Sequence, residues 1–409
     1  MSSITDFFRR HRGKIIAGSV IAGGTYLAQK YLRQYLEEQR QLEADRNLAA
    51  AATQAFGMDP QRMMLQNRKF YIFDSNQRTC DNSILQIIPS IKSKLQKRFD
   101  VESSADHLKK AAETSTNKVE IWNQMKVDAF TRLLSASISY TILVLSLKVQ
   151  ISILAAQIYE NSKQSVPNKF ESWYSRIWYS LGGRMAQVKP RTGEAKKNWD
   201  VSGLKNSSAV QQLFLQALQF FVSKGVDSLA DFAQPIIVDQ LSTMSLKDPI
   251  TYDQLKKVFE ELRSKLINSD TNGRHFSFYV VPLCHTGTLP DEPVLEELLI
   301  LLKTVLESPE AQQMFDYGLD MFLDGALKYA INAVPEYQLD GAQHKLRSIE
   351  KPSAASNASV PLARLIPVLT DAFHEISRIN FDSSLSNFII SQELNDFCVK
   401  VFERDECIW

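Results

Sequence analysis

A long apolar segment in the first half of the chain constrains the fold most. From about Val119 to Tyr159 the sequence is largely apolar, and Leu133–Leu147 carries no charged residue. Arg132 and Lys148 bracket this uncharged part, and several serines interrupt it, so it makes a poor membrane span. A helix of this length that is apolar on every side is typical of the centre of a large bundle. The segment therefore predicts a buried core helix.

The composition supports an all-α fold, a large single helical bundle around this central helix. With 409 residues, 44% of them hydrophobic, the chain can build a sizeable core. Its 15 glycines and 14 prolines are few for a turn-rich sheet protein. Apolar residues recur at spacings of three and four through most of the remaining segments. We expect helices over residues 103–113, Ser207–Met244, Tyr252–Ile267, Pro293–Leu306, Pro309–Ala333, Leu362–Ile379 and Leu385–Phe402.

Two shorter segments give further expectations. Ser75 or Asn76 is a candidate cap for a helix that follows, and the apolar face of that helix should be broken near Pro89. The run His275–Leu283 has the composition of a strand. Because it is isolated, we interpret it as an ordered crossing segment.

The N-terminal residues predict a membrane anchor that precedes the bundle. The run Ile15–Ala28 is uncharged, but as a helix it is only about 21 Å long, against a hydrocarbon core of about 30 Å. Extension to Leu32 gives about 27 Å if Lys14 and Lys30 snorkel to the interface. The predicted anchor, residues 15–32, includes Ile15, Ile16, Val20, Ile21, Tyr26 and Leu27, and its basic targeting flank includes Arg9, Arg10, Arg12 and Lys14.

Two other interpretations of this run are weaker. A cleaved signal peptide also has a basic start and a short apolar core, but no small-residue cleavage site follows here. A soluble amphipathic helix needs a polar face, which residues 15–28 lack. Basic residues are similar in number on both sides, so charge alone leaves the orientation of the anchor open.

We divide the chain into a basic flank at residues 1–14, the anchor at 15–32, a charged helical linker at 33–69 and a helical docking domain at 70–409. An inserted loop at 160–205 interrupts the domain and mixes basic residues with tryptophan and tyrosine. That pattern suits lipid headgroups or single-stranded nucleic acid. A solvated insertion with a few aromatic side chains folded onto the domain is the favoured interpretation.

Motifs for catalysis or metal binding are missing from the sequence. It has no Gly-rich phosphate loop, nucleophile elbow, paired-histidine zinc helix or dinucleotide fingerprint, so we expect no enzyme activity, cofactor or metal. Cys284 and His285 are neighbours, but adjacent residues on an extended segment point to opposite sides. The four cysteines lack disulfide or zinc spacing, and a net charge of +1 gives no reason to expect nucleic acid.

The start of the long helix carries a candidate binding surface. Trp122 and Met125 lie three residues apart on one helix face, just after a polar loop. Tryptophan side chains often anchor a binding partner and the flexible methionine side chain adapts to its shape, so the pair suits a groove that receives an apolar helix of a partner. Ordinary core packing of one more turn explains the same spacing and, on the pattern alone, is slightly favoured.

Four short motifs, in order along the chain, resemble those of a known family. They are SNQRTC at Ser75–Cys80, the stretch Glu120–Arg132 that begins with EIW and ends with FTR, LESP at Leu306–Pro309, and PLARLIP at Pro361–Pro367. In this order and spacing the chain resembles the peroxin-3 family of peroxisomal biogenesis factors. Residues 57–69 and the loop at 160–205 depart from the family pattern.

The resemblance implies a peroxisomal membrane protein, with transit through the endoplasmic reticulum as a further implication. A single N-terminal anchor would lie in the lipid bilayer, and the helical domain would face the cytosol. Its partner would be peroxin-19, which brings newly made peroxisomal membrane proteins and whose N-terminal amphipathic helix would enter an apolar groove at the membrane-distal end. The family's groove positions correspond to Trp122, Met125, Ala105 and Leu108, with Lys118 at the rim.

The resemblance makes partner binding the better interpretation of Trp122. Two functions of other classes stay open. A membrane-tethered enzyme would need a deep pocket with convergent polar groups. A secreted helical protein would need signal cleavage and an oxidising compartment, which four unpatterned cysteines do not favour.

Overall fold

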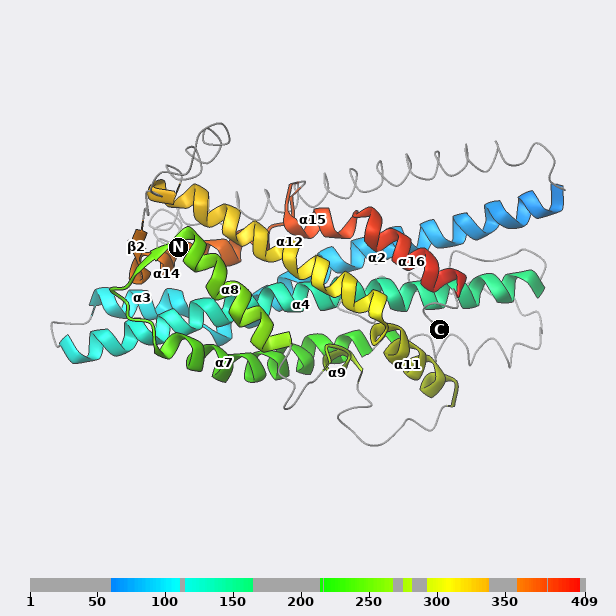
Figure 1. Cartoon of the computed structure of the whole chain (residues 1–409). Helices are drawn as coiled ribbons and strands as arrows, with labels where there is room; N and C mark the ends of the chain where they lie inside the picture. Colours follow the sequence, from blue (N-terminus) through cyan, green and yellow to red (C-terminus); the bar gives the residue numbers. More distant parts are fainter. Residues whose placement is uncertain are drawn as a thin grey trace, which may run out of the picture.

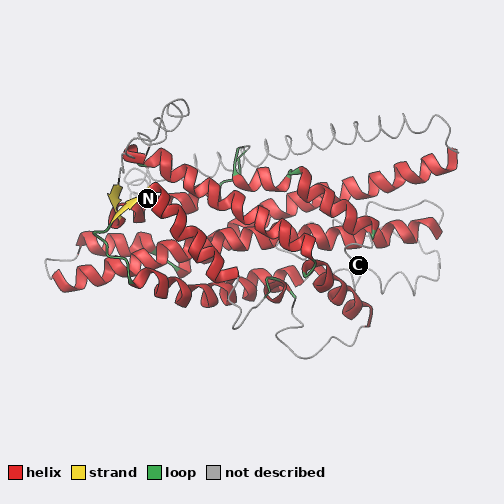
Figure 2. Ribbon diagram, in the orientation of Figure 1, coloured by secondary structure: helices red, strands yellow, loops and turns green. Residues whose placement is uncertain are grey.

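The computed structural model describes residues 60–110, 115–164, 214–215, 217–267, 275–281, 293–337, 359–380 and 382–404. The predicted basic flank, the anchor, most of the linker and most of the loop at 160–205 lie outside the described residues. Over the described residues the protein is an elongated bundle of helices with a small two-stranded sheet at one end (Figures 1 and 2). The predicted all-α class is confirmed.

Helix α4, Ser115–Gln164, runs through the centre of the bundle (Figure 1). Helices α2, α7, α12, α14 and α16 all pack against it. By length and apolarity its segment Lys118–Glu160 is long enough to cross a membrane, but 94% of its most apolar window is buried inside the protein. Buried hydroxyls such as that of Thr141 donate to a backbone carbonyl one turn earlier. The prediction of a central core helix is confirmed.

Helix α2, Pro60–Arg98, is longer than the sequence pattern suggested. The predicted break near Pro89 is wrong, because the helix continues through it. Pro89 is exposed, so its ring lies on the solvent side of the helix. Toward the core, isoleucine and leucine side chains are buried along the length of the helix, namely Ile84, Leu85, Ile88, Ile91 and Leu95.

The predicted cap at Ser75 or Asn76 is also wrong, because both residues lie inside α2. Asn76 Nδ2 donates to the carbonyl oxygen of Ile72 at 2.6 Å, and Thr79 Oγ1 donates to that of Ser75 at 3.1 Å. Polar side chains that bond one turn back leave the backbone ladder intact. The helix is continuous across residues 69 and 70 and so joins the predicted linker to the predicted domain.

Helix α3, Val101–Lys110, follows α2 in the same general direction, antiparallel to α4, and packs on the first part of α4. It begins two residues earlier than the predicted helix at 103–113, because Asp100 caps it. The backbone amide of Ser103 donates to Asp100 Oδ1 at 2.9 Å. Phe99 and Val101 are buried on either side of this cap and hold the junction between α2 and α3 against the core.

The predicted helix Ser207–Met244 is partly within the described residues. Residues 217–220 are helical and lead into a π-helical turn, η1, at Phe221–Gly225, followed by α7 at Val226–Ser242. Lys94 of α2 donates from Nζ to the carbonyl oxygens of Val222 and Ser223 in this turn. The widened turn was not predicted, because apolar spacing alone does not distinguish it from an α-helical turn.

Three helices match their predicted bounds: α8 at Tyr252–Ile267, α11 at Pro293–Leu306 and α12 at Pro309–Ala333. Two of these agreements, at α8 and α12, have a local cause at the helix start. At α12, for example, the backbone amide of Ala311 donates to Ser308 Oγ at 3.2 Å, and Pro309 occupies the first turn.

Two short strands form at positions that the sequence marked as joints between helices, and a short helix forms where it suggested an extended crossing segment. Strand β1, Pro249–Thr251, pairs antiparallel with β2, Ser359–Pro361. The run at His275–Leu283 has the composition of a strand, but within it Ser277–Val280 forms the helix α9. The prediction of an extended segment there is wrong. The aromatic residue before α9, Phe276, stacks on Phe315 of α12 with ring centroids 4.7 Å apart.

Three helices complete the bundle: α14 at Leu362–Ile376, α15 at Ser384–Ile389 and α16 at Gln392–Glu403. The prediction of one helix over Leu385–Phe402 is wrong. Ser391 is extended, with φ −61° and ψ 141°, and separates α15 from α16. The apolar spacing continues across this break because both helices bury one side against the same core.

Candidate functional site

The predicted binding residues lie on two helices that pack together, α3 and the first turns of α4. Figure 1 shows them at the end of the molecule that also carries α14 and the small sheet. Ala105 and Leu108 come from α3, whereas Lys118, Trp122 and Met125 come from α4. The chain thus brings the two parts of the predicted surface to one end of the bundle.

Trp122 lies where α4 changes from an exposed to a buried helix. Val119, one turn earlier, is 56% exposed, whereas Ala129, two turns later, is fully buried. Trp122 and Ile121 are between these extremes: both are partly buried and pack against the core. A half-buried tryptophan beside an exposed valine leaves apolar surface that an incoming apolar side chain can cover.

Ala105 and Leu108 on α3 have the same intermediate burial. Both pack against the core while keeping part of their surface exposed. They are three residues apart, so they share the face of α3 that follows the buried Val101. Lys118, also partly buried, lies in the first turns of α4 and adds a positive charge beside this apolar surface.

Met125 has a different environment from its predicted neighbours. Only 3% of it is exposed, and it belongs to the core cluster. One helical turn after Trp122, the same face of α4 has already turned inward. In this structure Met125 therefore belongs to the core, and of the predicted pair only Trp122 keeps partial exposure.

Lys126 holds this end of α4 to α7. Its side chain is buried, and Nζ donates to the carbonyl oxygens of Leu241 at 2.9 Å and Met244 at 2.7 Å. Burial lowers the pKa of Lys126, while the nearby charge of Asp248 raises it. Cations near the last carbonyls of a helix interact favourably with its dipole, so this lysine also completes the end of α7.

A second buried charge, Asp128, lies six residues beyond Trp122 on α4. Burial raises the pKa of the Asp128 carboxyl, and the hydrogen bond from Gln124 and the charge of Arg132 oppose this shift. Gln124 Nε2 donates to Asp128 Oδ1 at 2.9 Å. Both buried charged groups near the apolar surface, Lys126 and Asp128, therefore have hydrogen-bond partners within the protein.

Sequence reasoning did not single out Val119 and Lys126 at this site. Val119 precedes Trp122 by three residues, so the spacing that grouped Trp122 with Met125 also groups it with Val119. No sequence signal marks Lys126, because the carbonyl groups it binds are 115 and 118 residues away. The predicted anchor and flank residues, from Arg9 to Leu27, lie outside the described residues.

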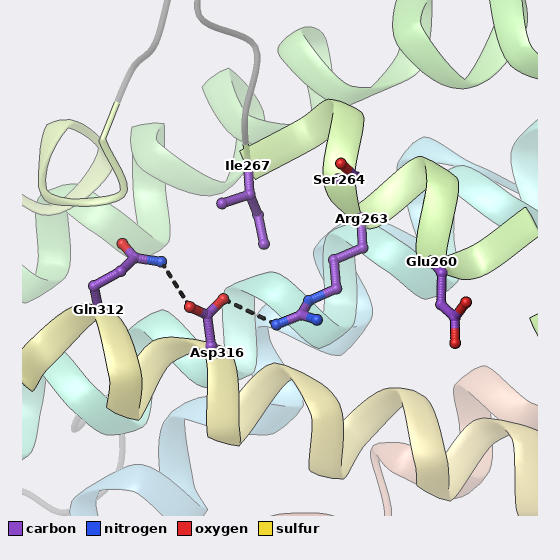
Figure 3. A pocket seen from close by; sticks show the side chains of 6 residues that line it. All are labelled: Glu260, Arg263, Ser264, Ile267, Gln312 and Asp316. Atoms are coloured by element: carbon purple, nitrogen blue, oxygen red, sulfur yellow. Dashed lines mark hydrogen bonds and ion pairs between the residues drawn. The ribbon is translucent and has the colours of Figure 1, made fainter. Parts of the chain in front are cut away.

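A polar pocket of about 530 Å³ lies elsewhere, between α8 and α12 (Figure 3). Arg263 pairs there with Asp316 at 2.9 Å and with Asp320 at 3.1 Å, and Gln312 Nε2 donates to Asp316 Oδ2 at 3.3 Å. These groups bind one another across the two helices. Among the residues that the structure describes, no group of three His, Cys, Asp or Glu side chains is arranged to hold a metal ion.

Comparison with known proteins gives a consistent result. The Peroxin-3 family model matches residues 6–117 and 109–404 of this chain. The chain is similar to peroxisomal biogenesis factor 3 of Bos taurus, with 24% identity over 416 residues that cover 98% of this chain and 96% of the relative. It is similar to the Homo sapiens protein of the same name, with 24% identity over 418 residues covering 98% and 97%. Peroxisome biogenesis protein 3-1 of Arabidopsis thaliana is 24% identical over 260 residues, covering 63% and 62%.

Proposed function

This chain belongs to the peroxin-3 family of peroxisome biogenesis factors, and from that premise we propose that it is a docking receptor for peroxin-19 at the peroxisomal membrane. It binds the N-terminal amphipathic helix of peroxin-19 and supports the insertion of peroxisomal membrane proteins, which it reaches through that partner. Residues 15–32 anchor it in the bilayer as a single span, and the helical domain faces the cytosol. The role requires no catalytic step.

The observation that carries this proposal is the environment of Trp122. It is partly buried at the start of α4, beside a valine that is 56% exposed and next to the helix that supplies Ala105 and Leu108. An amphipathic helix binds by placing apolar side chains, one turn apart, between the ridges of two such helices. Tryptophan is enriched among the residues that dominate such interfaces.

Lys118 gives the proposed surface a polar rim. Its charge lies on α4 one turn before Trp122, outside the apolar centre. Charged residues at a rim contribute more to the association rate and to partner choice than to affinity. We expect an acidic residue on the partner helix to approach this lysine.

The decisive experiment measures binding of a synthetic peroxin-19 N-terminal peptide to the full-length chain in detergent micelles. We expect Trp122→Ala to weaken binding by about 2 kcal/mol or more, as for a buried aromatic anchor. Tyr71→Ala is the matched control. Tyr71 is an aromatic residue, 71% exposed, in the part of α2 that contacts α16 through the pairs Lys69–Glu403 and Phe73–Phe402.

The Tyr71 variant should bind the peptide as the unmodified chain does. Equal loss of affinity in both variants would indicate a general effect of removing exposed aromatic surface, and unchanged affinity on Trp122→Ala would overturn the proposal. Circular dichroism at the temperature of the binding measurement establishes that each variant is folded.

The membrane part of the proposal has a separate test. Deletion of residues 1–32 should release the chain from peroxisomal membranes into the soluble fraction, while binding of the peptide is retained. Retention of the truncated chain after alkaline carbonate extraction would contradict a single N-terminal anchor.

A further inference from the structure

A charged cluster joins α3, α4 and α14 beside the proposed binding surface. At its centre is Arg132 of α4, whose side chain is fully buried. Its Nη1 donates to Glu102 Oε2 at 2.7 Å and to the backbone carbonyl oxygen of Phe99 at 3.2 Å. Its guanidinium lies over the ring of Phe373, 4.6 Å from the ring centroid. Arg132 thus contacts both ends of the turn that leads into α3 and one residue of α14.

Glu102 of α3 contacts both α4 and α14 through its two carboxylate oxygens. Oε2 accepts from Arg132, and Oε1 lies 3.1 Å from Nε2 of His374 on α14. Burial raises the pKa of Glu102, but hydrogen bonds from His374 and Arg132 outweigh it and hold the pKa at about 2. The carboxylate is therefore ionised at neutral pH and bridges α4 to α14.

This carboxylate is one of two counter-charges, with Glu375, in a cationic neighbourhood. Lys92 of α2 has a lowered pKa because of burial and because Arg378 and Arg132 lie near it, while Glu102 and Glu375 oppose that shift. Without the charge of Glu102, a fully buried arginine would lose its ion-pair partner among the described residues. A buried charge without a partner is strongly unfavourable.

Helix α3 depends on such contacts for its position. It spans only ten residues, Val101–Lys110, and isolated helices of that length are marginal in water. Its first turn carries the Asp100 cap, the buried Val101 and Glu102. Its second half carries Leu108, which is only partly buried. The firm attachment is therefore at the N-terminal end, through Glu102.

We propose that Arg132, Glu102 and His374 act as positioning residues for partner binding, by fixing α3 at the angle that opens the apolar surface between Leu108 and Trp122. This inference rests on the proposed function, because it assigns the cluster a part in binding the amphipathic helix. The three residues do not touch the partner. They act by holding the shorter of the two helices that do.

The test uses the full-length chain with Glu102→Gln, which keeps the shape of the side chain and removes its charge. We expect the affinity for the peroxin-19 peptide to fall about fivefold or more. Backbone amides of 101–110 should exchange with deuterium about threefold faster or more in the free protein, whereas those of α12 should not change. Glu102→Asp, which keeps the carboxylate, should recover part of the affinity.

Asp74→Asn is the matched control. Asp74 forms an ion pair with Arg78 within α2 at 2.8 Å, with 28% and 26% of the two side chains exposed. Removing that charge should change neither peptide affinity nor exchange in α3. A similar loss in this variant would show that any lost ion pair has the same effect, and would overturn the assignment.

The possible results separate this inference from the proposed function. If the unmodified chain does not bind the peptide, the proposed function fails. If it binds and Glu102→Gln binds equally well, the proposed function stands and the positioning role is overturned. Weaker binding without faster exchange in α3 also overturns it, because the loss would then not arise from the position of this helix.

Discussion

Asp81 of α2 and Lys148 of α4 form an ion pair inside the bundle, with Oδ1 and Nζ 2.6 Å apart and 3% of each side chain exposed. Four residues back on α2 and four residues forward on α4, Gln77 Nε2 donates to Ser152 Oγ at 2.9 Å. Both contacts therefore fit one antiparallel register of the two longest helices. A slide of one turn would separate buried polar groups from their partners, which is costly.

Replacing one partner of this pair should strongly destabilise the protein. We expect Lys148→Met to lower the free energy of unfolding by about 3–5 kcal/mol, because it leaves the Asp81 carboxylate without its cation. The double variant Asp81→Leu with Lys148→Met should recover most of this loss. Denaturant unfolding followed by circular dichroism measures both. A double variant as unstable as the single one would mean that packing, and not charge, explains the effect.

The contribution of Glu102 to stability should depend on pH in the acidic range. Its pKa falls from 4.5 to about 2 in the folded protein, so folding favours the ionised form. For a lowered pKa, the stabilisation is complete above the unfolded value and is lost as the pH falls toward the folded value. The difference in unfolding free energy between the unmodified chain and Glu102→Gln should be largest at neutral pH and shrink between about 4.5 and 2. A difference that does not vary over this interval would contradict the assignment.

Gly318 in α12 should not tolerate alanine. A Cβ there would lie 2.5 Å from Cζ of Phe388, a rigid and fully buried ring on α15. Alanine ordinarily stabilises a helix interior by about 1 kcal/mol relative to glycine. Here we expect a loss of about 1–3 kcal/mol from overpacking. Thermal unfolding tests the sign, and Phe388→Leu in the same chain should relieve part of the clash.

Lys126→Met should loosen the contact between α4 and the end of α7. The variant keeps much of the apolar stem but removes the donor to the carbonyl groups of Leu241 and Met244. We expect a loss of about 1–3 kcal/mol in unfolding free energy and faster amide exchange at the end of α7. Exchange that stays unchanged there, with stability also unchanged, would show that water replaces the ammonium group at no cost.

Helix bounds were predictable where a local signal set them. Pro309 after Ser308 marks the start of α12, and the bounds of α12 match the prediction. Taking proline as a sign of a helix boundary failed at Pro89. This proline lies on the exposed side of α2, and the helix continues through it because its other side is packed along its whole length. The prediction also failed at Ser391, where the apolar spacing continues through a change in backbone direction.

The candidate site was predictable only in part. The family resemblance located Trp122 and α3, and the structure places them on packed helices. It could not show that Met125 is buried, because three-residue spacing does not fix which side of a helix meets the core. The cluster around Arg132 could not be predicted from the sequence, because Glu102 and His374 are 272 residues apart in the chain.

The burial of α4 has a consequence for the synthesis of this protein. The ribosome completes α4 well before it makes α12, α14 and α16, which later cover it. During that interval an apolar helix is available to the machinery that inserts segments into membranes. Arg132 and Lys148 limit its uncharged length to about 22 Å, against a hydrocarbon core of about 30 Å, and four serines and a threonine lie within that length. The same two residues that form buried ion pairs in the finished protein thus help to keep the nascent helix out of the bilayer.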